Sequence, residues 1–194
     1  MNTTRLTHLL NEERMGAGTG PGPHNENTVQ GLIDLCNFIP SPENMKMVEI
    51  GCYLGVSTEV FCLHFKEVIG IDTWGLNHEK YHEANWSAER IGDWETIKNL
   101  CHSRLIAYPN CKLIHDVSEK IACTFRAASL DFVYIDGNHA QVHVDINNWL
   151  PKIKNGGYIG GHDYEYIKDI ISEKTKLDTS KFKIFKETSW LCQK

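Results

Sequence analysis

Short apolar runs alternate along this chain with longer amphipathic stretches, and this alternation restricts the fold more than any other feature. Short apolar runs suit buried parallel strands, whereas stretches with a helical period suit helices that cover a sheet. The runs lie at residues 47–50, 68–71, 112–115, 132–135 and 158–161, with two more at 182–185 and 189–192. The pattern predicts a three-layer, doubly wound α/β fold, with a mostly parallel seven-stranded sheet that ends in an antiparallel C-terminal hairpin.

Helices are expected between these strands, at 27–39, after residue 57, and at 91–105, 118–128, 142–153 and 164–174. Three local signals support their ends. Asn27 is a candidate N-cap with Gln30 as its capping-box partner, and Ser57 is a candidate N-cap of the second helix. Glycine in the segment 155–157 would supply a left-handed cap before the fifth strand. Residues 27–194 are therefore expected to form one domain.

The N-terminal 26 residues differ in composition from the rest of the chain. Their glycine-rich part, residues 16–24, is too flexible to be a core element. We expect residues 1–26 to be a flexible leader or a lid over the ligand, and we slightly favour the lid. The first 14 residues lack the apolar stretch of a signal peptide, and no run reaches the length of a membrane span. A cytoplasmic protein without a membrane partner is expected.

Charge and cysteine content narrow the class of partner. The net charge is −5, whereas a protein that chiefly holds nucleic acid would be expected to carry a basic patch. The seven cysteines are scattered and show no metal or redox spacing. A small-molecule partner is favoured, nucleic acid is not expected, and homo-oligomerisation stays open.

Polar residues follow the predicted strands, where ligands of open α/β sheets bind. The residues at these ends are Gly51, Asp72, Asp116, Asp136 and the pair His162-Asp163. A purely structural sheet has no reason to end four of five strands on or beside an aspartate. The carboxyl edge of the sheet is therefore the predicted functional site.

The glycine turn after the first strand indicates a nucleoside cofactor. It reads Glu49-x-Gly51-x-x-x-Gly55, which departs from the G-x-G-x-x-G fingerprint of dinucleotide folds. Gly51 permits a sharp turn and a close approach to a ligand, and the helix start at Gly55 turns backbone amides toward it. A carboxylate at Asp72 can accept hydrogen bonds from both hydroxyls of a ribose.

The segment 48–57, together with 69–72, resembles class I S-adenosylmethionine-dependent methyltransferases, which have a Rossmann-like fold. The resemblance extends from about Met47 to the last strand. It implies that Glu49 and Gly51 lie by the methionine part, that Asp72 holds the ribose, and that Asp116 flanks the adenine. The implied cofactor-binding residues are Glu49, Gly51, Tyr53, Gly55, Ser57, Asp72, Thr73, His115, Asp116 and Val117.

Two later motifs, residues 131–139 and 156–164, narrow the resemblance. Together they look like the metal-dependent O-methyltransferases that modify sugars, typified by macrocin and mycinamicin methyltransferases and the cephalosporin-hydroxylase-like group. The resemblance implies S-adenosylmethionine and Mg²⁺ as cofactors and a hydroxyl of a sugar or glycoside as the acceptor. A polar residue followed by Pro-Pro and an aromatic residue, typical of N-methyltransferases, is absent.

Methyl transfer to oxygen needs an aligned and deprotonated hydroxyl, which a divalent cation and a nearby base provide. Asp136 and Asp163, with His162, are the predicted metal ligands, and Asp136 and His139 are the predicted catalytic residues. A histidine of near-neutral pKa suits the base, and related sugar methyltransferases have one at the position of His139. His162 replaces an acidic residue of the relatives, which leaves the ligand set open.

A polar, aromatic segment at residues 73–90 would leave the sheet on the cofactor side and shape the acceptor pocket, or else pack an extra helix or a subunit contact. Its candidate residues are Trp74, His78, Tyr81, His82 and Trp86. Two other functions stay open: a nicotinamide-dependent oxidoreductase, and a non-catalytic S-adenosylmethionine-binding protein.

Overall fold

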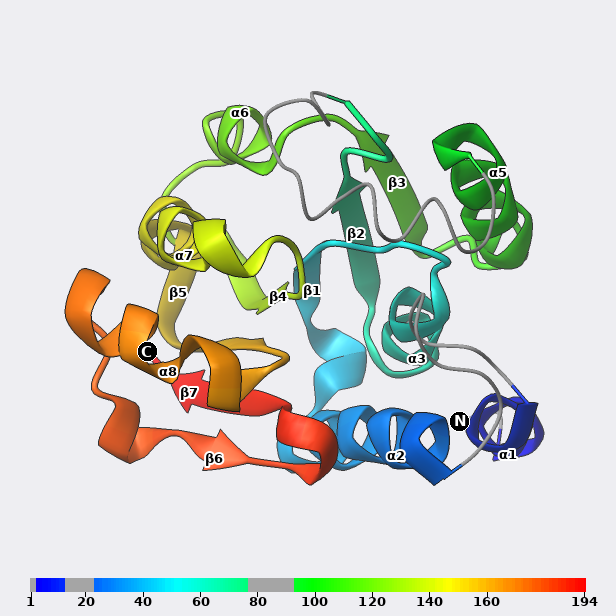
Figure 1. The fold of residues 1–194 in the computed structure, drawn as a ribbon, viewed down its shortest axis with the longest axis horizontal. Helices are drawn as coiled ribbons and strands as arrows, with labels where there is room; N and C mark the ends of the chain where they lie inside the picture. Colours follow the sequence, from blue (N-terminus) through cyan, green and yellow to red (C-terminus); the bar gives the residue numbers. More distant parts are fainter. Residues whose placement is uncertain (1–2, 13–22, 77–92) are drawn as a thin grey trace.

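A seven-stranded sheet runs through the molecule in the order β3-β2-β1-β4-β5-β7-β6 (Figure 1). The computed structural model describes residues 3–12, 23–76 and 93–194. The strands are β1 (Lys46–Ile50), β2 (Glu67–Asp72), β3 (Cys111–His115), β4 (Leu130–Ile135), β5 (Ile153–Gly161), β6 (Lys183–Ile184) and β7 (Trp190–Gln193). The first five are parallel, and β7 is antiparallel to both of its neighbours. The predicted fold class is confirmed.

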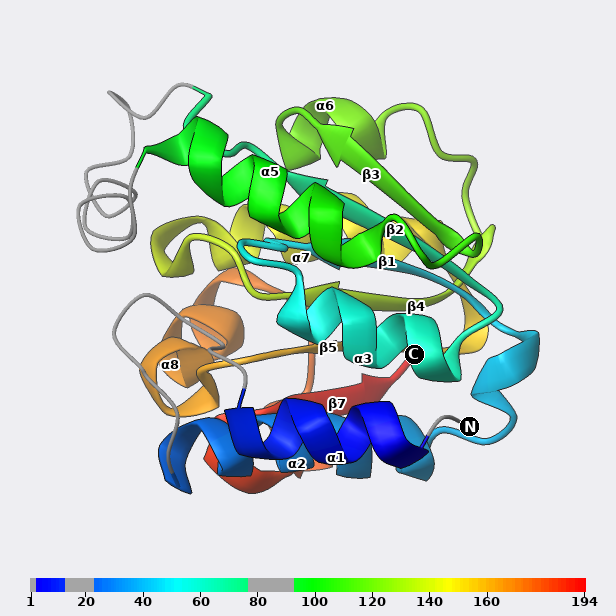
Figure 2. The same ribbon diagram turned by 90° about the vertical axis from the view of Figure 1, so that its right-hand side faces the viewer.

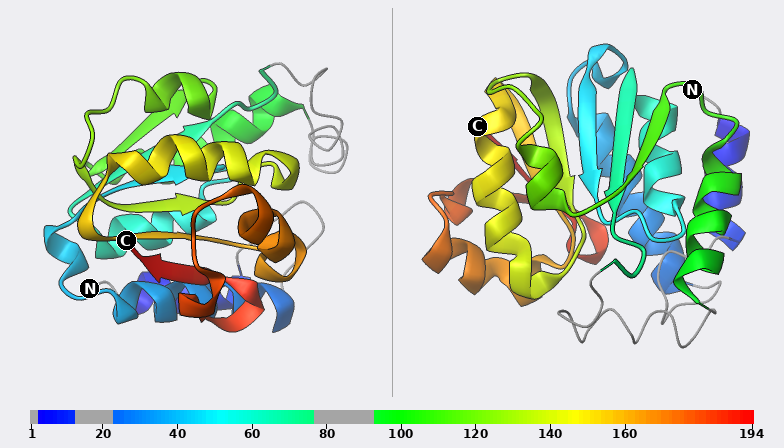
Figure 3. Two further views of the ribbon diagram at one scale, coloured as in Figure 1. Left: turned by 90° about the vertical axis from the view of Figure 1, so that its left-hand side faces the viewer. Right: turned by 90° about the horizontal axis from the view of Figure 1, so that it is seen from above.

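Helices cover both faces of the sheet (Figures 2 and 3). One face carries α1 (Thr3–Glu12), α2 (Pro23–Phe38), α3 (Val56–His64) and α5 (Trp94–Leu105), and the other carries α6 (Ser118–Ala122), α7 (Val142–Trp149) and α8 (Tyr164–Lys174). Two hydrophobic clusters correspond to these faces. In β1, Met47 joins one cluster while Val48 and Ile50 join the other, so the strand is apolar on both sides. This double burial explains the continuous apolar runs of the sequence.

The register of the parallel strands brings their carboxyl ends to one edge. Ile50 lies between Ile71 and Ile135, and Ile135 is paired with Gly161. The strand order reverses at β1, because β2 and β3 lie on one side of it and β4 and β5 on the other. Such a switch point is where open α/β sheets bind their ligands.

Part of the N-terminal segment is helical. Residues 3–12 form α1, in which Leu6 and Leu9 are buried in the core, whereas the sequence predicts a flexible leader or a lid over 1–26. Residues 13–22, which include most of the predicted glycine-rich lid, lie outside the described residues. Within the described ranges, no helix combines the length and apolar character that a membrane crossing needs.

Helix α2 begins at Pro23, so Asn27 lies inside the helix instead of capping it. The side-chain amide of Gln30 donates to the carboxylate of Asp34, one turn later in the helix, at 2.8 Å. Proline at a first helical position loses no hydrogen bond, because the first amides of a helix have no intrahelical acceptor.

The glycines at residues 155–157 belong to β5 and do not cap α7, which ends at Trp149 and passes through a short 3₁₀ turn. The pairing of β4 with β5 shifts register between Leu130 and Phe132. A Cβ added at Gly157 would lie 2.7 Å from the Asp131 carbonyl oxygen. Glycine is therefore needed there for the close approach of two strands.

Candidate functional site

The glycine loop that follows β1 lies against the end of β4. Gly51 has a φ of 90°, and a Cβ added there would lie 2.2 Å from the Asp136 carbonyl oxygen. Its amide donates to the Ile71 carbonyl at 2.9 Å. The loop therefore depends on glycine for both its turn and its close contact with β4.

Asp72, at the end of β2, braces this loop. One carboxylate oxygen accepts hydrogen bonds from the amides of Cys52 and Tyr53, both at 2.8 Å, and the other accepts from the Trp74 amide at 2.8 Å. Burial raises the pKa of Asp72, and these bonds oppose the rise. Because a carboxylate has about four acceptor positions, three amides leave room for about one further donor. The structure gives Asp72 a loop-bracing role that the sequence did not predict.

Glu49 and Ser57 lie beneath the loop. Glu49 is fully buried and accepts a hydrogen bond from the Ser57 hydroxyl, which is itself buried. Burial raises the pKa of Glu49 to about 8, although the Ser57 bond lowers it. Helix α3 instead has Gly55 at its N-cap, with a φ of 80°, so the predicted cap at Ser57 is wrong.

The residues predicted to flank the adenine lie next to Asp72. The ring of His115 contacts the Thr73 carbonyl through Nε2 at 2.7 Å, and the Asp116 amide donates to the Asp72 carbonyl at 3.2 Å. The Asp116 carboxylate accepts from the Val117 amide, and an ion pair with Lys120 holds its pKa below the usual range. Hydrogen bonds thus connect the ends of β2 and β3 to the glycine loop along one edge of the sheet.

Across the switch point from this edge lies a second group, Asp136, His162 and Asp163. Each offers a ligand atom, and these atoms all lie within 4.8 Å of one another. A small pocket lies between the ends of β4 and β5 and helices α7 and α8. It is lined by Ile135, Asp136, Gly137, Asn138, His139, Val142, His162 and Ile167. The structure thus brings together all four residues that the sequence predicted for metal and catalysis.

Asp163 connects the two histidines of this group. His139 Nε2 lies 2.8 Å from one of its oxygens, and His162 Nδ1 lies 3.2 Å from the other. Although burial opposes it, these contacts hold the pKa of Asp163 well below its usual range. Burial disfavours the charged form of His162, but Asp163 and Asp136 outweigh it and raise the pKa to about 9. The carboxylates of Asp136 and Asp163 therefore dominate the electrostatics of this group.

The donor set fits a divalent cation. Two carboxylates supply hard oxygen ligands, and the imidazole of His162 adds a nitrogen ligand. Magnesium prefers oxygen donors, whereas manganese, iron and zinc also accept imidazole. The residues present therefore suit a cation of the second kind better than the Mg²⁺ that the resemblance implies.

The aromatic residues near the candidate site differ from those that the sequence predicts for the acceptor pocket. Trp74 is 4% exposed and donates through Nε1 to the Tyr53 carbonyl at 3.0 Å, so it packs against the glycine loop. His78, Tyr81, His82 and Trp86 lie outside the described residues. Tyr166, which the sequence did not single out, is 76% exposed, and its ring lies parallel to that of His139, with centroids 6.3 Å apart. The sequence feature that could have indicated Tyr166 is its position three residues after Asp163, in the first turn of a helix, where the two side chains lie on the same face.

Solved structures similar to this chain are methyltransferases of several kinds. An rRNA methylase from Streptococcus thermophilus is 16% identical, with a TM-score of 0.55 over 88% of this chain and 94% of that one. An S-adenosylmethionine-dependent O-methyltransferase from Thermotoga maritima is 12% identical, with a TM-score of 0.51 over 74% and 49%. Phosphoethanolamine N-methyltransferase 1 from Haemonchus contortus, solved with S-adenosylhomocysteine, is 17% identical, with a TM-score of 0.50 over 73% and 28%.

This chain therefore spans about half or less of the length of two of these proteins. At such low identity the likeness shows the fold alone. No curated protein matches the sequence closely enough for comparison. A family model described as a methyltransferase domain matches residues 48–164, which are more than half of the chain. The protein belongs to this methyltransferase-domain family.

Proposed function

We propose that the protein transfers a methyl group from S-adenosylmethionine to a hydroxyl of a small molecule, with the help of a divalent cation. One observation carries the proposal. The group of Asp136, His162 and Asp163 lies at the same sheet edge as the glycine loop, and Asp136 itself contacts Gly51. A donor site for the methyl group and a site for a hydroxyl would then be adjacent, as an in-line displacement requires.

The cofactor would lie along the edge from Gly51 to Asp116. The ribose hydroxyls are neighbours of Asp72 in this arrangement, and the adenine lies between His115 and Asp116. The amides at the start of α3 would face the methionine part. This places the reactive methyl at the switch point, toward β4.

His139 is the proposed base. In the tautomer whose Nε2–H donates a hydrogen bond to the Asp163 carboxylate, the other ring nitrogen, Nδ1, has the lone pair that would accept a proton from the acceptor hydroxyl. The acceptor oxygen then forms a bond to the methyl carbon as the carbon–sulfur bond breaks. Asp136, His162 and Asp163 would hold a cation that lowers the pKa of the hydroxyl.

A sugar or glycoside is the favoured acceptor. The exposed ring of Tyr166 lies beside His139, and aromatic faces suit sugar rings as well as planar groups. The net charge of −5 favours a neutral small molecule over nucleic acid. The family match favours methyl transfer over the nicotinamide chemistry of the alternative hypothesis.

The test follows labelled methyl from S-adenosylmethionine to a set of simple glycosides, with and without added Mn²⁺ or a chelator. Asp163→Asn is expected to reduce transfer by about tenfold to a hundredfold, whereas binding of S-adenosylhomocysteine is retained. Asp169→Asn, which makes the same change at an exposed position of α8, is the matched control. Transfer that is unaffected by a chelator would overturn the metal part and leave His139 as the base. Failure to bind S-adenosylhomocysteine at micromolar concentration would overturn the whole proposal.

A further inference from the structure

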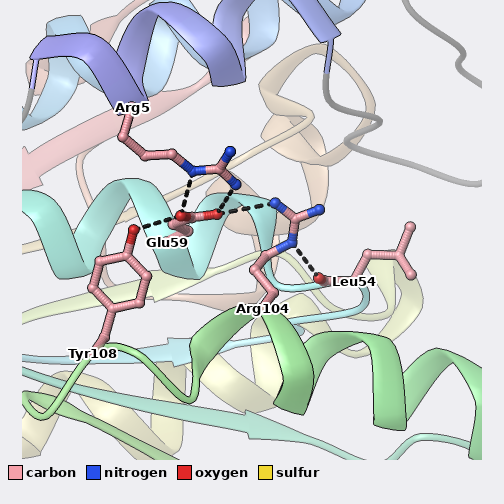
Figure 4. Close-up of polar contacts among 5 residues, drawn as sticks. All are labelled: Arg5, Leu54, Glu59, Arg104 and Tyr108. Atoms are coloured by element: carbon pink, nitrogen blue, oxygen red, sulfur yellow. Dashed lines mark hydrogen bonds and ion pairs between the residues drawn. The ribbon is translucent and has the colours of Figure 1, made fainter.

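Glu59, on α3, is a buried carboxylate that contacts three different parts of the chain (Figure 4). Its side chain is 3% exposed. It faces α1, α5 and the segment after α5, and no residue of the proposed catalytic group touches it. Its contacts are with Arg5, Arg104 and Tyr108. A buried carboxylate with these partners holds their positions, because both guanidinium groups would lose a charged acceptor if the carboxylate were removed.

Arg5 binds Glu59 with two parallel hydrogen bonds. Its Nε lies 2.7 Å from one carboxylate oxygen, and a terminal nitrogen lies 2.8 Å from the other. A bidentate pair of this kind fixes geometry as well as charge. Through it, α1 is tied to α3 across 54 residues of sequence.

Arg104 extends the network to the glycine loop. One of its terminal nitrogens donates to Glu59 at 2.9 Å, while its Nε donates to the Leu54 carbonyl at 3.0 Å. The guanidinium is planar, so the bond to Glu59 sets the direction in which Nε points. Glu59 therefore aims Arg104 at Leu54.

Helix α5 lies unusually close to the loop at this point. A Cβ added to Gly55 would lie 2.9 Å from the Cys101 sulfur and 3.1 Å from a methyl group of Leu105. Arg104 can thus reach the loop backbone from a helix that is packed directly on it. Asp72 holds the amides of the loop from one side, and Arg104 holds its carbonyl from the other.

We propose that Arg104 is a positioning residue for the cofactor loop, and that Arg5, acting through Glu59, makes α1 part of cofactor binding. This inference rests on the proposed function, because it takes the loop to be the cofactor site. It adds an element to that site, since α1 lies before the segment 48–164 that the family model matches.

The experiment measures the dissociation constant of S-adenosylhomocysteine by calorimetry for Arg104→Met and Arg5→Met. Methionine keeps most of the aliphatic length of arginine but removes the hydrogen bonds. We expect a loss of about tenfold for Arg104→Met and about threefold for Arg5→Met, which is the range for residues that act on a site through others. Tyr108→Phe is the control, because it removes a bond to Glu59 without touching Arg104 or the loop. It is expected to change affinity less than twofold.

A double variant tests the route of the effect. If Arg5 acts through Glu59 and Arg104, Arg5→Met in the Arg104→Met background causes little further loss of affinity. Where Arg104→Met lowers the Tm too far for titration, Arg104→Lys takes its place, since an ammonium cannot serve both acceptors with the geometry of a guanidinium. Affinity losses that merely follow the Tm, including an equal loss for Tyr108→Phe, would overturn the inference. Failure of the unaltered protein to bind S-adenosylhomocysteine would instead overturn the proposed function.

Discussion

At the scale of single residues, position 51 needs glycine for two separate reasons. Its φ of 90° disfavours any side chain, and the Asp136 carbonyl occupies the place of a Cβ. Gly156 has a similar φ of 81°, but nothing lies within 4 Å of the place of its Cβ. A side chain at Gly156 would therefore meet only the cost of the backbone conformation, whereas one at Gly51 would also collide with the Asp136 carbonyl.

Replacing each glycine by alanine should show this difference. Gly156→Ala is expected to lower the free energy of unfolding by about 1 kcal/mol, which is the cost of a left-handed residue with a side chain. Gly51→Ala is expected to lower it by about 3 kcal/mol or more, since β1 and β4 must also move apart. Urea unfolding measures both. Equal losses for the two variants would contradict the close contact between Gly51 and β4.

At the scale of elements, α1, α3 and α5 are held together by charge as well as by apolar packing. Hydrogen bonds from Arg5, Tyr108 and Arg104 outweigh burial and hold the pKa of Glu59 below its usual range. A carboxyl with a lowered folded-state pKa contributes stability above its unfolded pKa, near 4.3. That contribution is lost as the pH falls through the folded pKa.

Glu59→Gln is therefore expected to reduce stability at neutral pH and to weaken the dependence of stability on pH below about pH 4. Urea midpoints measured from neutral to acid pH compare the variant with the unaltered protein. Glu67→Gln is the matched control, because Glu67 forms only an exposed pair with Lys46, and such pairs contribute little. An acid limb of unchanged slope in Glu59→Gln would show that the Arg5 and Arg104 contacts do not form in solution.

Sequence reasoning predicted the elements whose signals are local and missed those that depend on distant partners. The strands were predicted because their burial on both faces leaves continuous apolar runs, and the aspartates that follow them indicated the candidate site. Ser57 was misread because serine suits a cap, whereas its hydroxyl serves the buried Glu49. The role of Glu59 could not be predicted, because its arginine partners lie 54 and 45 residues away in the chain.

At the scale of the whole molecule, the fold brings the carboxyl ends of the parallel strands to one edge but does not determine the acceptor. Proteins of this fold include methylases of rRNA and of phosphoethanolamine. Among the described residues of this chain, those around the switch point include Asp136, His162, Asp163, His139 and Tyr166.

Cofactor binding should stabilise the whole domain, because the glycine loop and Asp72 connect β1, β2 and β4. S-adenosylhomocysteine at about a hundredfold excess over its dissociation constant is expected to add about 2.7 kcal/mol to the free energy of unfolding. Asp72→Ala should abolish this gain, since three loop amides lose their acceptor. Thermal unfolding with and without the ligand measures it. A full gain in Asp72→Ala would show that the ligand binds elsewhere.

The place of β7 in the sheet also has a consequence for synthesis of the protein. Residues 190–193 pair with β5, and the Trp190 ring lies against Gly161, next to His162 and Asp163. Because α8 and β6 lie between Asp163 and β7 in the chain, β5 gains this neighbour only after the segment 164–189 has been synthesised. Until then the strand that ends in the two candidate ligands has an open edge on that side. The group of Asp136, His162 and Asp163 can therefore gain its packing against the Trp190 side of the sheet only after the glycine loop and helices α1, α3 and α5 have been synthesised.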